Sequence, residues 1–300
     1  MQFFKTPNIE FVGRGRRAML LSALLILTGL VSVAVHRGLR LSIDFAGGAL
    51  VEIKLDQPTP IGDVRSAVTA AGFGGAEVTR YGPPTEYLIK VKAVGNAAEV
   101  AEHLKDALSA GLAGSSVEIR RIESVGPKIG AELRTAAFWA VMYSLLGIVI
   151  YVSWRFQFRM AIAAIVALVH DVLITLGFFS VVDMEISLAV IAALLTIVGY
   201  SLNDTIVVFD RVREDLHTRR RENFDRIVNG ALNETLSRTL ITSGTTLLVV
   251  TSLAILGGEV IRDFALALLV GIFVGTYSSL FIATPVVVEW HRRRAGKDRR

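Results

Sequence analysis

The sequence predicts a membrane protein with six transmembrane α-helices and one α+β domain inserted after the first helix. Three observations support this fold class. Hydrophobic residues make up 52% of the 300 residues, and the mean hydropathy of +0.54 exceeds that of ordinary soluble domains. Six apolar runs are long enough to cross a bilayer. Between the first and second runs, the pattern changes to the short strands and helices that are typical of a folded domain.

The apolar runs set the expected domain organisation. Residues 1–17 form a short segment before the first helix, residues 37–135 form the inserted domain, and residues 291–300 form a basic tail. The expected transmembrane helices cover residues 18–36, 136–154, 160–182, 186–209, 239–256 and 264–288, so that the last five occupy 136–290.

Lys and Arg residues predict the orientation of these helices, because positively charged loops stay in the cytoplasm. They cluster in the segment before the first helix, between the second and third helices, between the fourth and fifth, and in the tail. The loops 183–185 and 257–263 together hold one Arg and four acidic residues. We therefore expect both termini in the cytoplasm and the inserted domain in the periplasm. The net charge of +5 is mostly this topology signal; it also favours anionic lipids, and it disfavours a function in nucleic-acid binding.

The first helix has some features of a secretory signal peptide. Basic residues at 14–17 precede it, and Ser32-Val33-Ala34 resembles a cleavage site. Its apolar run is longer than the roughly 7–15 residues of a signal core, so an uncleaved anchor is the preferred interpretation. The sequence contains no Cys, which excludes disulfides and thiol chemistry.

The inserted domain is expected to have the order βαββαβ, which is a ferredoxin-like arrangement. Asn96 is the expected N-cap of the second helix, with Glu99 at the capping-box position. His103 lies on that helix beside acidic residues, and a solvated helix face is the favoured interpretation over a metal site. The domain contains no catalytic constellation, so binding through a sheet edge or groove is more plausible. The expected strands cover 49–55, 76–81, 86–93 and 116–123, and the helices cover 61–71 and 97–110.

Glycines border the domain on both sides. Gly47 and Gly48 precede the first strand, and Gly126 and Gly130 lie between the last strand and the second membrane helix. They are tight turns in one interpretation, since glycine adopts unusual backbone angles without steric cost. In the other, they are hinges that let the domain tilt on the membrane part.

The fourth predicted helix carries Asn203 and Asp204 inside an apolar run. A charged side chain in the hydrocarbon costs roughly 2.5–3.5 kcal/mol, so such residues usually face the bundle interior and belong to ion pathways. On a helical wheel, Ile206, Val198 and Leu202 fall away from the polar residues. Asp204 is therefore expected to face protein. The polar face consists of Thr196, Tyr200, Ser201, Asn203 and Asp204.

Two further polar clusters lie in the membrane. His170 and Asp171 stand at the centre of the third helix, and Arg238 begins the fifth helix. The hydroxyl-rich face of the fifth helix includes Thr239, Thr242 and Thr246. A structural role remains open for each group: the threonines can join helices by hydrogen bonds, and Arg238 can reach the membrane surface. Together they are expected to line one polar path, with Tyr200 and Ser201 on the fourth helix.

The chemistry of this path suits a proton. A guanidinium that approaches or leaves a buried carboxyl group switches it between releasing and holding a proton. Asp204, Arg238, Asn203, Asp171 and His170 are therefore the candidate relay residues. Because no nucleotide-binding motif is present, an ion gradient is the expected energy source. We expect no catalytic residues, no metal and no cofactor.

Six motifs show a resemblance to the SecF subunits of the SecD/SecF family, within the RND superfamily of transporters. The chain resembles them over nearly its whole length. The motifs in the fourth and fifth helices are the most specific. They are DFAGGALVEI (44–53), VGPKIG (125–130), HDV (170–172), VGYSLNDTIVVFDR (198–211), LSRTLITSGTT (236–246) and GTYSS (275–279).

The resemblance implies half of a twelve-helix assembly whose other half is SecD. It implies association with the SecYEG channel, with YajC as a further partner, and contact with unfolded precursor proteins and the lipid bilayer. The implied activity is translocation driven by the proton-motive force at the inner membrane, not enzymatic catalysis. In the family, the proton-linked carboxylate falls on Asp204 and the gating arginine falls on Arg238.

Two other functions stay open. One is a half-size RND-type exporter of small solutes or lipids, which requires a substrate cleft in the outer domain. The other is an assembly subunit whose membrane charges are purely structural. Dependence on the proton gradient separates the assembly subunit from precursor translocation and small-molecule export. Binding of unfolded polypeptide separates translocation from small-molecule export.

Overall fold

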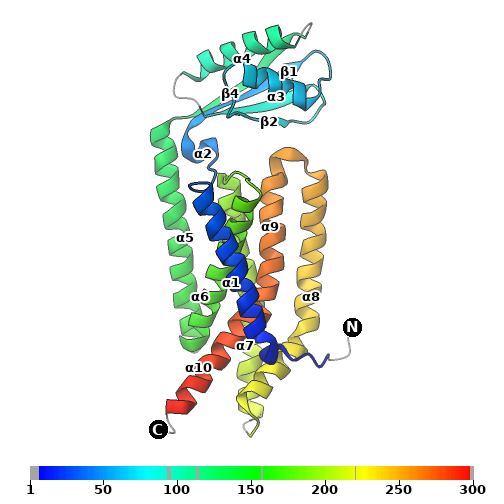
Figure 1. Cartoon of the computed structure of the whole chain (residues 1–300). Helices are drawn as coiled ribbons and strands as arrows, with labels where there is room; N and C mark the ends of the chain where they lie inside the picture. Colours follow the sequence, from blue (N-terminus) through cyan, green and yellow to red (C-terminus); the bar gives the residue numbers. More distant parts are fainter. Residues whose placement is uncertain (1–6, 93–95, 113–114, 157, 220, 298–300) are drawn as a thin grey trace.

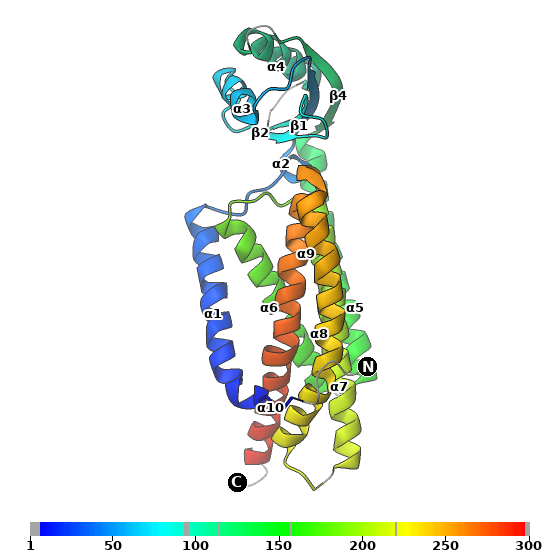
Figure 2. The ribbon, with the colours of Figure 1, turned by 90° about the vertical axis from the view of Figure 1, so that its right-hand side faces the viewer.

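The computed structural model describes residues 7–92, 96–112, 115–156, 158–219 and 221–297. It consists of a bundle of long helices with a small α+β domain at one end (Figure 1). Both described ends of the chain lie at the opposite end of the bundle, which we call the basic end because it carries the basic flanks of the helices (Figure 1). Figure 2 shows the domain above the outer ends of α5, α8 and α9.

Six helices in the described part are long and apolar enough to cross a membrane, as the sequence predicts. The last span is continuous from α9 through a π-helical turn, η1, into α10. The bounds are Phe11–Val35 for α1, Pro127–Arg155 for α5, Phe158–Val181 for α6, Leu188–Thr218 for α7, Phe224–Leu256 for α8, Gly258–Ser278 for α9, Ser279–Ala283 for η1 and Thr284–Lys297 for α10.

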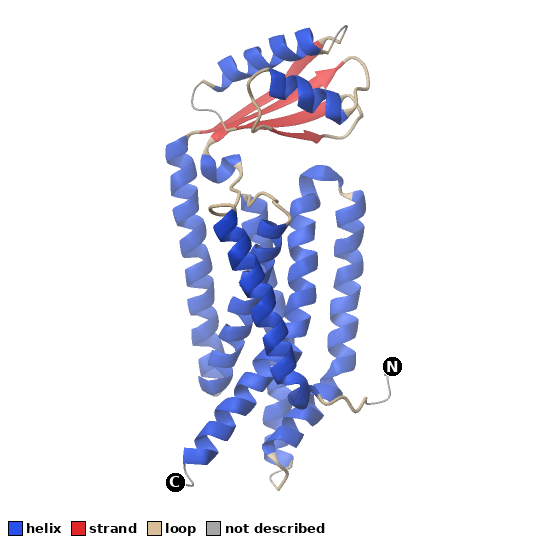
Figure 3. Ribbon diagram, in the orientation of Figure 1, coloured by secondary structure: helices blue, strands red, loops and turns tan. Residues whose placement is uncertain are grey.

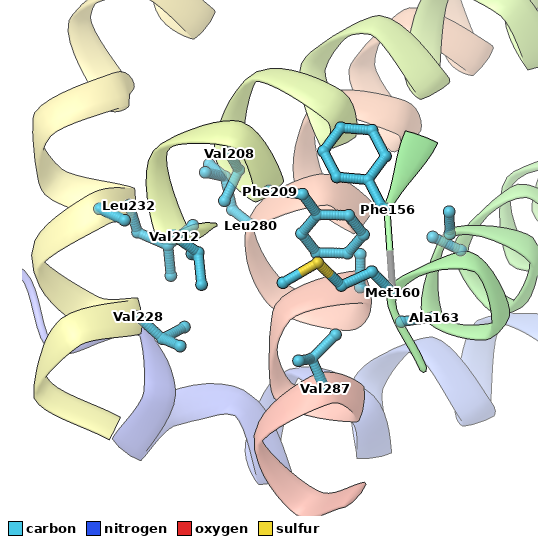
Figure 4. Packing of buried hydrophobic residues seen from close by; sticks show 14 of the residues in the cluster. Phe156, Met160, Ala163, Val208, Phe209, Val212, Val228, Leu232, Leu280 and Val287 are labelled. Atoms are coloured by element: carbon cyan, nitrogen blue, oxygen red, sulfur yellow. The ribbon is translucent and has the colours of Figure 1, made fainter. Parts of the chain in front are cut away.

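Several helices extend beyond the apolar runs that predicted them. α5 starts at Pro127, not at residue 136, because Gly126 is its N-cap and proline suits the first turn of a helix. α7 continues to Thr218 and α8 starts at Phe224, so the expected loop 210–238 is mostly helical. Their apolar faces continue past the membrane run and pack together. Val212 of α7 lies opposite residues such as Val228 and Leu232 of α8 (Figure 4).

Ion pairs join the same extensions of α7 and α8. Glu234 of α8 accepts hydrogen bonds from Arg211 and from Arg219, the latter at 2.8 Å. Arg211 also pairs with Asp215, which is only 2% exposed, at 3.4 Å. The charged loop expected from the sequence is therefore an ordered helical pair with both an apolar and an ionic contact.

The inserted domain confirms the predicted βαββαβ order. Its four strands form one antiparallel sheet in the order β2-β3-β1-β4, and α3 and α4 cover one face of it (Figure 3). Asn96 caps α4 by accepting a hydrogen bond from the Ala98 amide at 3.1 Å. His103 stacks edge-on against Phe73, with ring centroids 5.4 Å apart. The bounds are Gly48–Leu55 (β1), Ile61–Ala70 (α3), Glu77–Arg80 (β2), Glu86–Val91 (β3), Ala97–Gly111 (α4) and Val117–Val125 (β4).

The domain joins the bundle through the short helix α2 (Ile43–Ala46) and the start of α5. The bordering glycines allow a very close approach here. Gly47 has a φ of 80°, and a Cβ on Gly130 would lie 2.8 Å from the Phe45 carbonyl oxygen. Arg134 donates to that same oxygen at 2.7 Å. The glycines thus serve tight packing in this structure, and their role as hinges stays a proposal.

A group of charged residues forms a second contact between domain and bundle, which we call the docking cluster. Glu185, in the loop between α6 and α7, is 6% exposed. Its carboxylate lies 3.3 Å from Lys92 at the end of β3 and 3.3 Å from Arg40. On the domain, Glu77 pairs with Lys90 at 3.0 Å. The cluster therefore ties the sheet to the loop that precedes α7.

The largest buried cluster of the bundle lies at its basic end. Phe209 packs against Phe156 and Met160 there, and the two phenyl centroids are 6.4 Å apart (Figure 4). Val198 and Leu202, which the wheel placed away from the polar face of α7, also belong to this cluster. α7 therefore contacts protein on most of its circumference and lies at the centre of the bundle.

Candidate functional site

Asp171 is the best-satisfied polar group inside the bundle. It lies in the middle of α6 and is 0% exposed. Its Oδ2 accepts hydrogen bonds from Ser201 Oγ of α7 at 2.6 Å and from Ser278 Oγ of α9 at 2.8 Å. Its Oδ1 lies 2.9 Å from Nδ1 of His170. Three contacts from three helices therefore hold this carboxyl group in place.

His170 extends the cluster to α1. Its Nε2 lies 2.9 Å from Ser22 Oγ. Ser22 in turn donates to the Tyr277 hydroxyl at 3.2 Å, and Tyr277 donates to the Ala18 carbonyl at 2.8 Å. The imidazole and the Tyr277 ring are stacked, with centroids 6.1 Å apart. A continuous chain of polar groups thus runs from Asp171 to the backbone of α1.

His170 and Asp171 form one hydrogen-bonded pair inside the bundle. A neutral imidazole carries a proton on one ring nitrogen, so its tautomer decides whether Nδ1 donates to Asp171 or Nε2 donates to Ser22. The polar chain thus joins an imidazole to a carboxyl group, two groups that can each take up or release a proton.

Asp204 forms a second, sparser cluster. It is 3% exposed, in agreement with the prediction that it faces protein. Its Oδ2 accepts one hydrogen bond from Ser243 Oγ of α8 at 3.2 Å, and Ser243 accepts from Thr276 of α9 at 2.8 Å. Asp204 is thus held less tightly than Asp171.

The structure places Arg238 and Asn203 on the outer surface of the protein. Both residues are exposed. Within the described residues, no ion pair joins Arg238 to Asp204, although the Arg238 charge acts on the carboxyl group at longer range. The expected contact between guanidinium and carboxylate is therefore not formed in this state.

The predicted polar path is divided between the two clusters. Ser201 was expected beside Asp204 but donates to Asp171, because its side of α7 faces α6 and α9. Tyr200 donates to Thr246 at 3.1 Å and so joins α7 to α8. Thr242 bonds to carbonyl groups of its own helix, at 3.0 and 3.1 Å. Thr239 Oγ1 is buried and has no hydrogen-bond partner among the described residues.

Ser243 lies on the hydroxyl-rich face that was expected on the fifth helix, but four other residues of the clusters were missed as site residues: Ser22, Thr276, Tyr277 and Ser278. A signal for three of them was present in the sequence. Thr276-Tyr277-Ser278-Ser279 is a polar run in the middle of an apolar helix, which is the same pattern that drew attention to Asp204. The run leads directly into the π-helical turn, and such turns are frequent at functional sites.

The outward face of α7 carries an exposed stripe at helical spacing. Its residues are small or polar, which is unusual for a surface that faces lipid. A polar side chain such as that of Asn203 is satisfied in a membrane by another protein surface. The stripe consists of Ala192, Thr196, Gly199 and Asn203.

Two sequence families match the chain. The family described as "Protein export membrane protein SecD/SecF, C-terminal" matches residues 105–293, which is more than half of the chain. The chain belongs to the SecD/SecF family of protein-export membrane proteins. The "SecD/SecF GG Motif" matches residues 33–59, which include Gly47 and Gly48. The resemblance found in the sequence is therefore confirmed.

Curated SecD/SecF relatives match nearly the full chain. Protein translocase subunit SecF of Desulfurispirillum indicum is 45% identical over 292 residues, covering 95% of this chain and 92% of the relative. The subunit of the same name from Magnetococcus marinus is 47% identical over 290 residues, covering 95% and 93%. The chain is thus a multi-pass membrane protein with the length of these SecF relatives.

Solved structures of SecDF share the fold. SecDF from Thermus thermophilus, described as a translocon-associated membrane protein, has a TM-score of 0.82 and 38% identity. The match covers 95% of this chain and 39% of the SecDF chain. SecDF in a super-membrane-facing form has a TM-score of 0.75, covering 99% and 40%. This chain therefore spans about two-fifths of those proteins.

Proposed function

We propose that this chain is a membrane subunit of the bacterial Sec export machinery that works with a SecD partner. Together they use the proton-motive force to drive or complete the translocation of precursor proteins and to release them in the periplasm. The observation that carries this proposal is the buried pair His170–Asp171, with a second buried carboxyl group, Asp204, on the neighbouring helix α7.

The arrangement supports coupling of proton movement to helix movement. The contacts of Asp171 come from α6, α7 and α9, and those of Asp204 come from α8 and, through Ser243, from α9. Gain or loss of a proton at either carboxyl group changes which hydroxyls can donate to it. Each proton step therefore alters the contacts between helices. Moving one charge through 100 mV supplies about 2.3 kcal/mol, enough to shift a two-state equilibrium.

A second membrane chain explains the exposed groups of the site. Arg238 and the stripe on α7 that ends at Asn203 lie at the surface of this chain, where lipid would leave them unsatisfied. SecD supplies that second surface in our proposal, since the SecDF structures contain a chain more than twice as long. Arg238 then approaches Asp204 only in some states of the assembly.

The membrane orientation follows from the same proposal. The basic end of the bundle faces the cytoplasm with both termini, and the α+β domain lies in the periplasm, as the distribution of Lys and Arg favours. In the inner membrane the assembly contacts the SecYEG channel, with YajC as a further partner, and unfolded precursor chains on the outer side. No cofactor is needed, because the gradient supplies the energy.

The test measures completion of precursor export by inverted membrane vesicles that contain this chain and SecD, with and without a proton gradient. Asp204→Asn should abolish the gradient-dependent part of export while the complex still assembles. Asp210→Asn is the matched control, because Asp210 lies on the same helix but is half-exposed and paired with Arg155 at 3.2 Å.

Each outcome decides between functions. Loss in the Asp204 variant and wild-type behaviour in the Asp210 variant support proton coupling at Asp204. Export that stays gradient-dependent in both variants contradicts it. If export never depends on the gradient, the chain is an assembly subunit; if the gradient drives efflux of small solutes but not precursor export, it is an exporter.

A further inference from the structure

A cavity of about 870 Å³ opens at the basic end of the bundle, between α1 and α10. Neither of the two polar clusters contributes to it. α1 lines it with Val12, Arg16 and Met19, which recur at helical spacing and so share one face. α10 lines it with Pro285, Val286, Val288, Glu289, Trp290, Arg292 and Arg293. The cavity thus combines an apolar wall with a group of guanidinium ions.

The π-helical turn η1 lies between α9 and α10, where the last span changes direction. The helix is locally widened over the π-helical turn Ser279–Ala283, and Thr284 Oγ1 donates to the Ser279 carbonyl at 2.9 Å. α10 then runs obliquely away from α9 (Figure 1). It touches α1 where a Cβ on Gly15 would lie only 2.7 Å from Pro285. The cavity lies beside this contact.

The height of the lining residues matches a membrane surface. Met19 lies just inside the apolar run of α1, and Val286 and Val288 lie at the end of the apolar run of the last span. Arg16 and Arg293 lie just beyond these runs. Trp290 is 38% exposed, and tryptophan is enriched at the level of lipid head groups. The apolar part therefore reaches acyl chains, and the charged part reaches head groups.

The charges of the cavity are not fully compensated. Three arginines and one glutamate line it. Arg292 pairs with Asp225 outside the lining, and Glu289 pairs with Nε of Arg293 at 2.9 Å. Arg16 forms no ion pair with any described residue, although its charge acts on Glu289 at longer range. Arg16 is exposed on the face of α1 that lines the cavity, so its guanidinium can donate to an anion there.

We propose that this cavity binds one anionic phospholipid, with the phosphate diester between Arg16 and Arg293 and an acyl chain along Met19 and Val286. A guanidinium donates two parallel hydrogen bonds to a phosphate, which favours this head group over a diffuse charge effect. Basic pockets between membrane helices recognise anionic lipids in this way. Glu289 carries the opposite charge, so the test includes a zwitterionic lipid whose ammonium group could pair with it.

The test uses the full chain, purified in detergent and mixed with phosphatidylglycerol, phosphatidylethanolamine or phosphatidylcholine, and measures bound lipid by native mass spectrometry. Wild-type protein should retain phosphatidylglycerol preferentially. The double variant Arg16→Gln/Arg293→Gln should bind it about thirtyfold more weakly, since each basic residue contributes roughly fivefold and the two factors multiply. Arg14→Gln/Arg17→Gln is the matched control: both arginines are exposed on α1, and neither lines the cavity.

A second variant tests the apolar wall without changing any charge. Val286→Trp fills the cavity and should also lower phosphatidylglycerol binding, with the melting temperature measured to check that the fold is intact. Inorganic phosphate alone should not compete at millimolar concentration, because it lacks an acyl chain. The proposal is overturned if the control variant loses as much lipid as the double variant, if phosphatidylethanolamine binds equally well, or if both cavity variants retain phosphatidylglycerol.

Discussion

The docking cluster predicts a measurable equilibrium between domain and bundle. We consider Lys92→Met, which keeps the apolar stem but removes the charge that lies 3.3 Å from Glu185. Truncating one partner of a buried ion pair costs roughly 3–5 kcal/mol, and a surface pair contributes roughly 0.2–1 kcal/mol. Here Glu185 is 6% exposed but Lys92 is 41% exposed, and Arg40 still pairs with Glu185, so solvent and the second partner reduce the effect. We expect a loss of about 1 kcal/mol of docking energy, or about fivefold more undocked domain.

The absence of Cys makes the assay simple, because two introduced cysteines take spin labels without competing thiols. Ser109 of α4 lies on the α+β domain and Val260 at the outer end of α9 lies on the helix bundle, and both are exposed. Pulsed electron resonance then measures the distances between them, and the long-distance fraction should grow about fivefold in Lys92→Met. Lys105→Met is the control, since Lys105 pairs with Glu102 on the surface of α4. Identical distance distributions in wild type and Lys92→Met would refute the reasoning.

The same cluster predicts a pH dependence of docking. Burial, together with the neighbouring Glu77 carboxyl, raises the pKa of Glu185 above its usual value of 4.5. Burial acts in the same direction on Glu77, but the neighbouring Glu185 carboxyl and the charge of Lys90 hold the pKa of Glu77 below 4.5. Because the pKa of Glu185 is raised in the docked state, Glu185 stabilises docking fully when the pH is below its pKa in the undocked state. This contribution is lost as the pH rises through its pKa in the docked state. Glu77 has a lowered pKa, so it stabilises docking at higher pH, and its contribution is lost only as the pH falls through that lowered pKa.

Mild acidification should therefore increase the docked fraction, and a further decrease of pH should reverse it. The charged groups around Glu185 are Glu77, Lys90 and Lys92 of the domain, Arg40 and Asp183 of the loops, and Arg262 and Asp263 of α9. Glu185→Gln copies the protonated side chain and should abolish the increase. Docking that strengthens steadily as pH rises from 5 to 8, in the labelled protein, would contradict this assignment.

Two further predictions concern the bundle. Gly29→Ala should destabilise the protein by about 1–3 kcal/mol, because the new methyl group would lie 2.7 Å from the Gly177 backbone and push α1 away from α6. Thermal unfolding measures this loss of stability. Gly147→Ala is the control and should have little effect, because a Cβ on Gly147 meets open space. Ser278→Ala removes one of three hydrogen bonds to Asp171. It should lower gradient-dependent export several-fold and reduce the stability of the protein by about 1–3 kcal/mol. Equal export by the variant and the wild type would count against a role for the Asp171 cluster.

The architecture was predictable because hydrophobic length and periodicity carry it directly. Runs such as 160–182 and 264–288 exceed what a soluble helix needs, and the alternation in the inserted domain marks each strand. The lengths of α7 and α8 were not predictable in this way. Beyond Phe209, the helices are amphipathic and charged, and their stability comes from packing against each other, as at Val212 and Val228.

The candidate site was predictable in its residues but not in its partners. A charge inside an apolar run signals function by its cost, which singled out Asp171 and Asp204. A helical wheel gives the direction of a side chain but not the identity of the helix it faces. Ser201 therefore appeared to belong with Asp204, three residues away, although the packing of α7 against α6 turns it to Asp171.

α9 connects the parts of the molecule that these predictions treat separately. Its successive residues Thr276, Tyr277 and Ser278 bond towards the Asp204 cluster, towards Ser22 and to Asp171. Its outer end brings Asp263 close enough to Glu77 and Lys90 for their charges to interact. A rigid helix that touches both carboxyl clusters and the docking cluster can transmit a shift between them. If it does, Ser278→Ala must change the distance distribution between labelled domain and bundle as well as export; if the distances stay the same, the proton clusters and the docking equilibrium are independent.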